Sequence, residues 1–181
     1  MEHGKKAMRS AADEAAKKFE DRKQEAFKKL NELDKFKTAQ GVAGLTDEMM
    51  ESLYSQAYIL YNTGRYKDGL QVFRLLALLN PLEPKFIMGL AACFHMMKEY
   101  KSASSTYILV SILDPQNPIP CYHCSDCYIQ TGDKLSAIAI LESAIKRAGE
   151  KPEFAALKQR AIITMDALKK ELRELAKSNP Q

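Results

Sequence analysis

The sequence predicts an all-α protein built from stacked helical hairpins. Proline spacing is the first observation: Pro84, Pro118 and Pro152 lie 34 residues apart, and Pro81 and Pro115 repeat that spacing. Composition is the second: 46% of residues are hydrophobic and 28% charged, and eight glycines in 181 residues leave room for long helices. We therefore expect a helical repeat protein with one continuous core.

A period of 34 residues is typical of the tetratricopeptide repeat, a helix–turn–helix unit. When the three blocks are superimposed, equivalent positions hold residues of one kind. The shared positions are the turn, the small residues of the two helices and their large partners (Gly64, Lys98, Gly132; Ala57, Ala91, Ser125; Gly69, Ala103, Ala137; Leu60, Phe94, Tyr128; Phe73, Tyr107, Leu141). This predicts three repeats, at about 50–83, 84–117 and 118–151.

Residues 152–177 continue with one more helical pattern. Phe154, Leu157, Ala161, Met165 and Leu168 recur at helical spacing. A stack of repeats needs an end helix with a polar outer face. We therefore expect a capping helix at 152–177, which completes a tetratricopeptide superhelix domain at 45–177.

Residues 1–44 form a separate segment, predicted to be an N-terminal amphipathic helical arm. Met8, Ala12, Ala15, Phe19 and Leu30 lie along one narrow apolar stripe. Three interpretations stay open: the stripe packs on the first repeat, it makes a dimer or partner contact, or the arm is partly disordered.

The stretch Cys121–Cys127 reads CYHCSDC and resembles a metal or redox site at first sight. On one continuous helix, however, His123 points nearly opposite Cys121, and four ligands cannot surround a zinc ion. The repeat alignment places Cys121 and Cys124 in first-helix columns that face the second helix, the columns of Leu53 and Gln56. We therefore expect these thiols to pack in the core, with a zinc site and a thiol enzyme as the alternatives.

Several function classes find no support in the sequence. The net charge of +4 is mild and no basic run or nucleic-acid motif occurs, so direct nucleic-acid binding is not expected. No apolar run is long enough to span a membrane, and the first residues lack the apolar core of a secretory signal. No catalytic constellation, metal site or cofactor motif is predicted, and the free cysteines favour the cytoplasm.

The remaining candidate site is the inner face of the first helices. Tyr54, Tyr58 and Tyr61 lie at i, i+4 and i+7, on one stripe that points away from the predicted core columns. The equivalent columns complete a predicted peptide-binding groove (Tyr54, Tyr58, Tyr61; Met88, Ala92, His95; Tyr122, Asp126, Ile129). Tyrosine suits such a surface because its rigid apolar ring carries one polar tip. The alternative is that these tyrosines pack under a terminal helix.

Beyond the generic repeat, the sequence resembles the class II type III secretion chaperones of Gram-negative bacteria. The resemblance covers about 45–175 and is carried by GLAAC after NPLEPKF, by LDPQNPIPCYHCSDCYIQTGD, and by three repeats with one closing helix. It implies a bacterial cytoplasmic chaperone, not an enzyme, that binds hydrophobic secreted translocator proteins and keeps them soluble and apart until export. It also implies a homodimer and, for some members, pairing with a transcriptional regulator.

A general tetratricopeptide scaffold or transcriptional co-regulator, which binds a peptide segment of another protein, is the alternative function. The arm at residues 1–40 is longer and more charged than the resemblance implies. The dimer geometry is therefore not predicted.

Overall fold

The computed structural model describes residues 39–178, with side chains described as far as Leu175. The chain divides into two compact units, residues 1–44 and 45–181, each of which is treated by itself. In the first unit the described part is the short helix α2 (Ala39–Val42), which ends in a turn where Ala43 N–H donates to the Ala39 carbonyl. The predicted helix over residues 1–38 lies outside the described residues.

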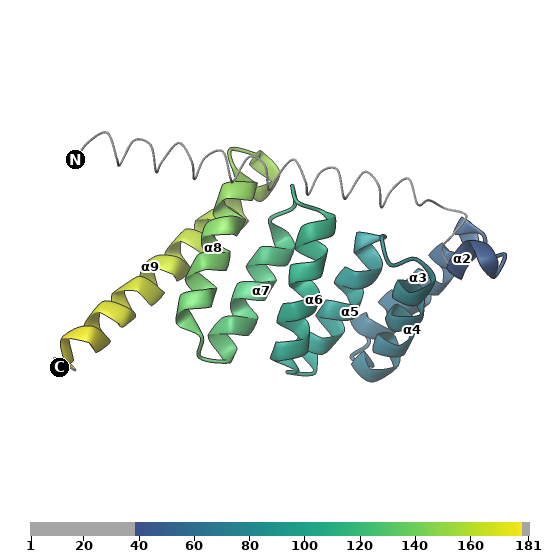
Figure 1. The fold of residues 1–181 in the computed structure, drawn as a ribbon, viewed down its shortest axis with the longest axis horizontal. Coiled ribbons are helices and arrows are strands. Elements are labelled where there is room, and N and C mark those ends of the chain that lie inside the picture. Colours follow the sequence, from purple (N-terminus) through teal and green to yellow (C-terminus); the bar gives the residue numbers. More distant parts are fainter. Residues whose placement is uncertain (1–38, 179–181) are drawn as a thin grey trace, which may run out of the picture. The chain divides into compact units, whose positions relative to one another are not determined.

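The second unit is a run of helical hairpins in chain order, drawn from blue to yellow in Figure 1. The three hairpins pair a first helix with a second helix: α3 (Asp47–Asn62) with α4 (Tyr66–Leu79), α5 (Pro84–Met96) with α6 (Tyr100–Leu113), and α7 (Ile119–Gln130) with α8 (Lys134–Ala148). A short 3-10 turn, η1 (Pro152–Phe154), leads into the long helix α9 (Ala155–Ser178). Each helix packs against the next along the chain. The predicted all-α repeat architecture is confirmed for the described residues.

The turn inside each hairpin has the same backbone conformation at the same repeat position. Gly64, Lys98 and Gly132 have φ values of 77°, 62° and 80°. After each of them the next N–H bonds to a carbonyl five residues back, as from Arg65 to Leu60 at 2.9 Å. These are Schellman motifs, which end a helix with one left-handed residue. Lys98 adopts a conformation that glycine holds at the other two turns.

The helix starts follow from local chemistry. Thr46 caps α3 by accepting a hydrogen bond from the Met49 N–H at 3.3 Å, and Asp133 caps α8 by accepting from the Ser136 N–H at 3.0 Å. Pro84 lies in the first turn of α5, where a backbone N–H would have no partner within the helix, so its absence loses no hydrogen bond.

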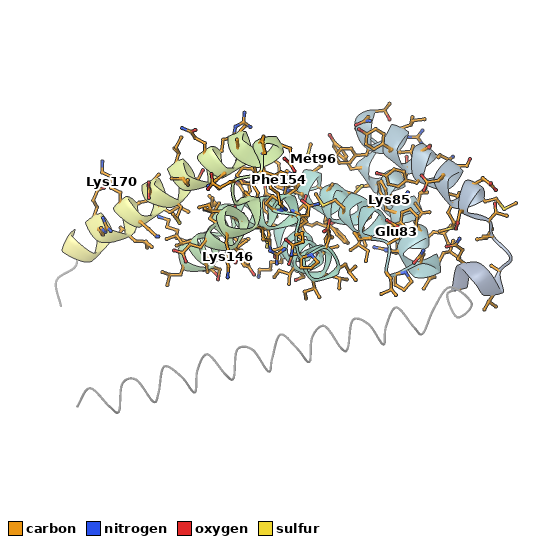
Figure 2. All side chains as sticks on the ribbon, turned by 90° about the horizontal axis from the view of Figure 1, so that it is seen from above. Glu83, Lys85, Met96, Lys146, Phe154 and Lys170 are labelled. Atoms are coloured by element: carbon orange, nitrogen blue, oxygen red, sulfur yellow. The ribbon has the colours of Figure 1, made fainter. Side chains whose placement is uncertain are left out.

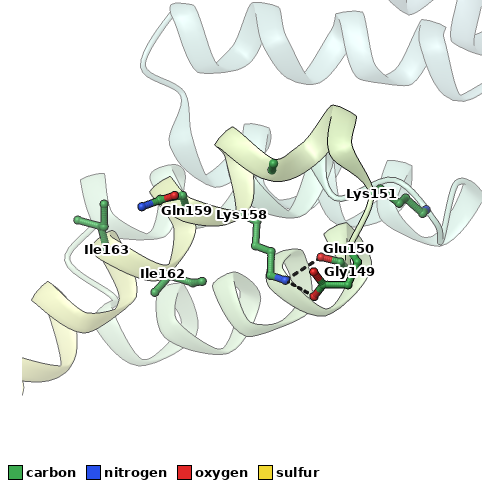
Figure 3. Close-up of a pocket in the computed structure, with 8 residues that line it drawn as sticks. Gly149, Glu150, Lys151, Lys158, Gln159, Ile162 and Ile163 are labelled. Atoms are coloured by element: carbon green, nitrogen blue, oxygen red, sulfur yellow. Dashed lines mark hydrogen bonds and ion pairs between the residues drawn. The ribbon is translucent and has the colours of Figure 1, made fainter.

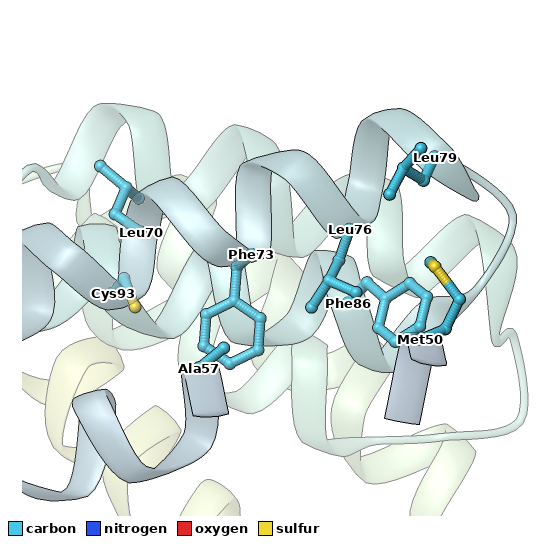
Figure 4. Close-up of a cluster of buried hydrophobic side chains, with 8 residues drawn as sticks. All are labelled: Met50, Ala57, Leu70, Phe73, Leu76, Leu79, Phe86 and Cys93. Carbon is cyan, nitrogen blue, oxygen red and sulfur yellow. The ribbon is translucent and has the colours of Figure 1, made fainter. Parts of the chain in front are cut away.

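The core lies where the two helices of a hairpin cross and where one hairpin meets the next. Ala57, Ala91, Ala103 and Ala137, from the small-residue columns, have no exposed surface. Around Ala57 the first cluster of large side chains joins α3, α4 and α5, as Figure 4 shows (Met50, Leu70, Phe73, Leu76, Leu79, Phe86, Cys93). Small residues at the crossings let the helices approach, so the large residues one turn away can interdigitate.

The last helix covers the end of the third hairpin. Ala161 and Leu168 of α9 are buried in a cluster with Ala137 and Leu141 of α8. Two ion pairs cross the same junction: Lys134 bonds Glu171, and Lys169 bonds Glu142. Among the described helices, none combines the length and the apolar character that crossing a membrane requires.

Candidate peptide-binding face

The cysteines are part of the core. Cys93, Cys121, Cys124 and Cys127 are free thiols with at most 2% of their surface exposed. Cys124 Sγ lies 3.6 Å from the Ser104 carbonyl, so it contacts the second hairpin. Across the described residues no group of His, Cys, Asp and Glu is arranged to hold a metal ion. The prediction that these thiols pack inward is confirmed by their burial.

Burial also sets the protonation of these thiols. It raises the pKa of Cys93 to about 11 and of Cys124 and Cys127 to about 12. The pKa of Cys121 is raised by burial too, although the nearby Arg147 works in the opposite direction. A thiolate is the reactive form of cysteine, and at neutral pH these thiols stay protonated.

The predicted groove residues lie on the first helices α3, α5 and α7, and we call them the first-helix face (Tyr54, Tyr58, Tyr61, Met88, Ala92, His95, Tyr122, Asp126, Ile129). Tyr58 is exposed, with 53% of its surface open to solvent, and the others are partly buried. Figure 2 draws the side chains of all three helices. Every member of the predicted set therefore keeps some open surface.

An aromatic cluster occupies the α3 part of the first-helix face. The rings of Tyr54 and Tyr58 stack at 6.3 Å between centroids, with 21° between their planes. Tyr54 also contacts Phe73 and Phe86, each at 5.9 Å, so its inner side belongs to the core. Burial raises the pKa of Tyr54, so the phenol is neutral and its hydroxyl remains a hydrogen-bond donor. Tyr58 is thus a solvent-exposed ring that stacks on the ring of Tyr54, which core contacts hold in place.

Lys85 is a charged neighbour of this cluster that the sequence analysis did not predict. Its Nζ lies 5.0 Å from the ring centroid of Tyr54 and 5.5 Å from that of Phe86, and it forms an ion pair with Glu51. Its pKa is raised, first by the hydrogen bond to Glu51. Glu51 and Lys85 are one repeat apart, so opposite charges in one repeat column were the signal available in the sequence.

A polar cluster occupies the other end of the first-helix face, between α5 and α7. His95 Nε2 lies 2.8 Å from Asp126 Oδ2, and His95 Nδ1 lies 3.4 Å from the Tyr107 hydroxyl. His123 stacks on Tyr107 with 5.5 Å between ring centroids. Burial lowers the pKa of His123, and the neighbouring His95 lowers it further while Asp126 opposes them. Sequence analysis placed His95 and Asp126 on one face but missed Tyr107 and His123 as their partners.

One predicted core position is wrong. Gln56 was assigned to a column facing the second helix, but its side chain is exposed. Met50 and Ala57 are the buried residues of α3, while Leu53 is partly buried. In the third repeat this column holds Cys124, which packs against the Ser104 carbonyl of the preceding hairpin, whereas Gln56 in the first hairpin is exposed.

A separate hollow of about 400 Å³ lies at the junction of α8 and α9, as Figure 3 shows. Apolar Ile162 and Ile163 form one side of it. Both of its lysines are engaged by groups of this chain. Lys158 Nζ donates to the Gly149 carbonyl at 2.8 Å and to Glu150 at 2.7 Å, and Lys151 Nζ donates to the Gln116 carbonyl at 3.4 Å. The first-helix face is therefore the stronger candidate.

Comparison with known proteins agrees with this architecture. The family model described as Tetratricopeptide repeat matches residues 50–81 and 84–117, the first two hairpins. The chain is 33% identical over 138 residues to the Low calcium response locus protein H of Yersinia pseudotuberculosis, covering 75% of this chain and 82% of that protein. The third hairpin, which the family model does not match, is clear in the structure.

Two solved structures extend the likeness to bound peptides. The Yersinia enterocolitica type III secretion chaperone SycD, in complex with a peptide of the translocator YopD, has a TM-score of 0.68 and 31% identity, covering 70% of this chain and 96% of that one. PcrH in complex with the chaperone binding region of PopD has a TM-score of 0.69 and 27% identity, covering 71% and 96%. Both are similar to this chain over nearly their whole length.

The fold and these comparisons define a tetratricopeptide-repeat protein of the secretion-chaperone class. The chain belongs to the class II type III secretion translocator chaperone family, as the resemblance in its sequence predicted.

Proposed function

We propose that this protein is a cytoplasmic chaperone of a type III secretion system that binds hydrophobic translocator proteins and keeps them soluble and apart until export. The first-helix face is the proposed binding site. An extended segment of the translocator would lie across α3, α5 and α7, with its apolar side chains against the tyrosines. Its backbone groups would bond the polar tips of this face.

The observation that carries the proposal is the open aromatic cluster on α3. Tyr58 is 53% exposed and stacks on Tyr54, which the core holds in place through Phe73 and Phe86. An exposed ring on a rigid base loses little conformational freedom when a ligand covers it. Solved relatives of the same fold hold peptides: SycD binds a peptide of the translocator YopD, and PcrH binds the chaperone binding region of PopD.

The proposed mechanism is reversible binding without turnover. Relatives are described as chaperones, and the thiols of this chain are buried and protonated. Binding removes an apolar segment from water and thereby lowers the concentration of aggregation-prone free translocator. Homodimer formation and pairing with a transcriptional regulator are further proposals that follow from the family.

Co-expression tests the proposal. A translocator such as PopD is produced alone and with this chain, and its soluble fraction is measured by sedimentation and immunoblotting. We expect the chaperone to move most of the translocator into the soluble fraction and to co-purify with it. A translocator that stays insoluble, although the chaperone itself is folded and abundant, would contradict the proposal.

A further inference from the structure

The polar cluster between α5 and α7 is a relay of hydrogen bonds that joins Tyr107, His95 and Asp126. The Tyr107 hydroxyl is buried, with 2% of the residue exposed, so it needs a hydrogen-bond partner, and His95 Nδ1 is in reach at 3.4 Å. If the hydroxyl donates, Nδ1 accepts and the ring proton sits on Nε2. Nε2–H then donates to Asp126 Oδ2 at 2.8 Å. Every donor of the relay is satisfied in this arrangement.

The cluster presents a carboxylate on the first-helix face. One oxygen of Asp126 is held by His95 Nε2 at 2.8 Å. The Asp126 side chain is 46% exposed, whereas that of His95 is 18% exposed. Among the described residues, Asp126 has no lysine or arginine within ion-pair distance. The second oxygen, Oδ1, is therefore available to a donor from outside.

The carboxylate is also held in one orientation. His95 on α5 holds the carboxylate through the hydrogen bond to Oδ2, and the buried Tyr107 holds His95 through its hydroxyl. His123 in turn stacks on Tyr107, with 5.5 Å between ring centroids. Tyr122 supports His123 at 5.9 Å. A charged acceptor that is already oriented loses less freedom when it binds a donor than a mobile surface carboxylate does.

We propose that Asp126 selects client segments that carry a lysine or arginine beside their apolar residues. This inference rests on the proposed function, and it adds a specificity-determining residue to the aromatic face. Charge-assisted hydrogen bonds are stronger than neutral ones, and a half-buried carboxylate is less screened than one on an open surface. His95 is a positioning residue that acts through Asp126.

Charge complementarity argues for this partner. The α3 end of the face has Lys85, but Glu51 already neutralises it, whereas among the described residues Asp126 at the α7 end has His95 and His123 near it and no lysine or arginine in ion-pair distance. A client carboxylate at that end would face repulsion, and a purely apolar segment would bury an unpaired charge. A basic side chain avoids both costs.

Peptide binding with matched variants tests the inference. Overlapping synthetic peptides of YopD and PopD are screened against the full chain, and each binder is remade with its lysines and arginines replaced by glutamine. Dissociation constants are then measured for wild-type protein, Asp126→Asn and the control Asp166→Asn. Asparagine at 126 still accepts from His95 but carries no charge, and Asp166 is an exposed residue of α9.

We expect the glutamine peptide to bind wild-type protein and Asp166→Asn about tenfold more weakly than the basic peptide, the size of a charge-assisted hydrogen bond. Asp126→Asn should bind both peptides alike, and raising the salt concentration should weaken only the pair that keeps both charges. An equal loss in Asp126→Asn and wild type would overturn this inference alone. If wild-type protein bound no peptide at all, both the inference and the proposed function would fail.

Discussion

The ring of Phe73 in α4 lies against Gly89 of α5, in the space that a side chain at position 89 would need. A Cβ added to Gly89 would overlap three carbons of that ring. Phe73 is itself 2% exposed and packed against Tyr54, so it has little room to move away. This contact sets how closely the first two hairpins approach.

Replacing Gly89 by alanine is therefore expected to lower the free energy of unfolding by about 1–3 kcal/mol, the usual cost of overpacking a core. Gly69→Ala is the matched control. A Cβ at Gly69 would make ordinary contacts at 3.5 Å, and alanine is the better helix former by about 0.5–1 kcal/mol. Urea unfolding of both variants measures the difference, and equal stability of the two would contradict this packing.

Lys98 occupies a turn position where its φ of 62° favours glycine. Lys98→Gly is expected to raise the free energy of unfolding by about 1 kcal/mol, because glycine adopts this conformation without a steric penalty. Gly132→Ala, at the same column with a φ of 80° and no atom within 4 Å of the added Cβ, should lose a similar amount. Thermal unfolding followed by circular dichroism checks both; a destabilised Lys98→Gly would refute the strain argument.

His123 gives the folded protein a pH dependence. Its pKa is lowered from 6.5 in the folded state, first by burial and then by His95, so the folded state favours the neutral ring. The unfolded chain takes up the proton as pH falls below about 6.5, and stability is lost from there down to the lowered folded pKa. Above about pH 6.5 the ring is neutral in both states, so His123 no longer makes the free energy of unfolding depend on pH.

His123→Gln removes the titrating ring and should flatten that slope, even if its stability at pH 7.5 is also changed. Urea midpoints of wild-type protein and variant, measured between pH 7.5 and 5.5, provide the test. An unchanged slope in the variant would show that another group causes the pH dependence.

Burial of the four cysteines predicts that their thiols react slowly with thiol reagents in the native protein. With pKa values of about 11 to 12 and almost no exposed surface, Cys93, Cys124 and Cys127 should not react with a thiol reagent in the native protein at pH 8. All four cysteines should react at once in urea. A fast phase in native buffer that accounts for one or more thiols would place that cysteine outside the core.

Tyr58→Ala should weaken translocator binding about 5–30-fold, the range of a 1–2 kcal/mol anchor, and change stability by less than about 0.5 kcal/mol. The reason is that Tyr58 is 53% exposed and its stacking partner Tyr54 is held by other contacts. Titration calorimetry with the PopD chaperone-binding region and a melting curve give the two values. A variant that unfolds instead would assign Tyr58 to the core.

Much of the fold could be predicted because the sequence repeats its own constraints. The small residues Ala57, Ala91, Gly69, Ala103 and Ala137 recur because each hairpin crosses in the same way, and each is buried in the structure. The turn column was found through Gly64 and Gly132, and the structure gives Lys98 the same left-handed backbone. Periodicity thus located the helices and turns.

The pairings between repeats could not be predicted in the same way. His95 meets Asp126 over 31 residues and Tyr107 over 12, and neither separation is the repeat period. The Phe73–Gly89 contact depends on the angle between two hairpins, which no single column encodes. Gln56 was assigned to the core with its whole repeat column, but the buried Cys124 fills that column in the third repeat and Gln56 is exposed in the first.

Site-specific photocrosslinking tests the central claim most directly. A photoreactive phenylalanine is placed at Tyr58 on the first-helix face or at Leu78 of α4, which is 70% exposed but lies outside the predicted groove. The full-length protein is then irradiated together with its translocator. The account predicts a crosslinked product from position 58 and little or none from position 78. Crosslinking from position 78 without any from position 58 would contradict it.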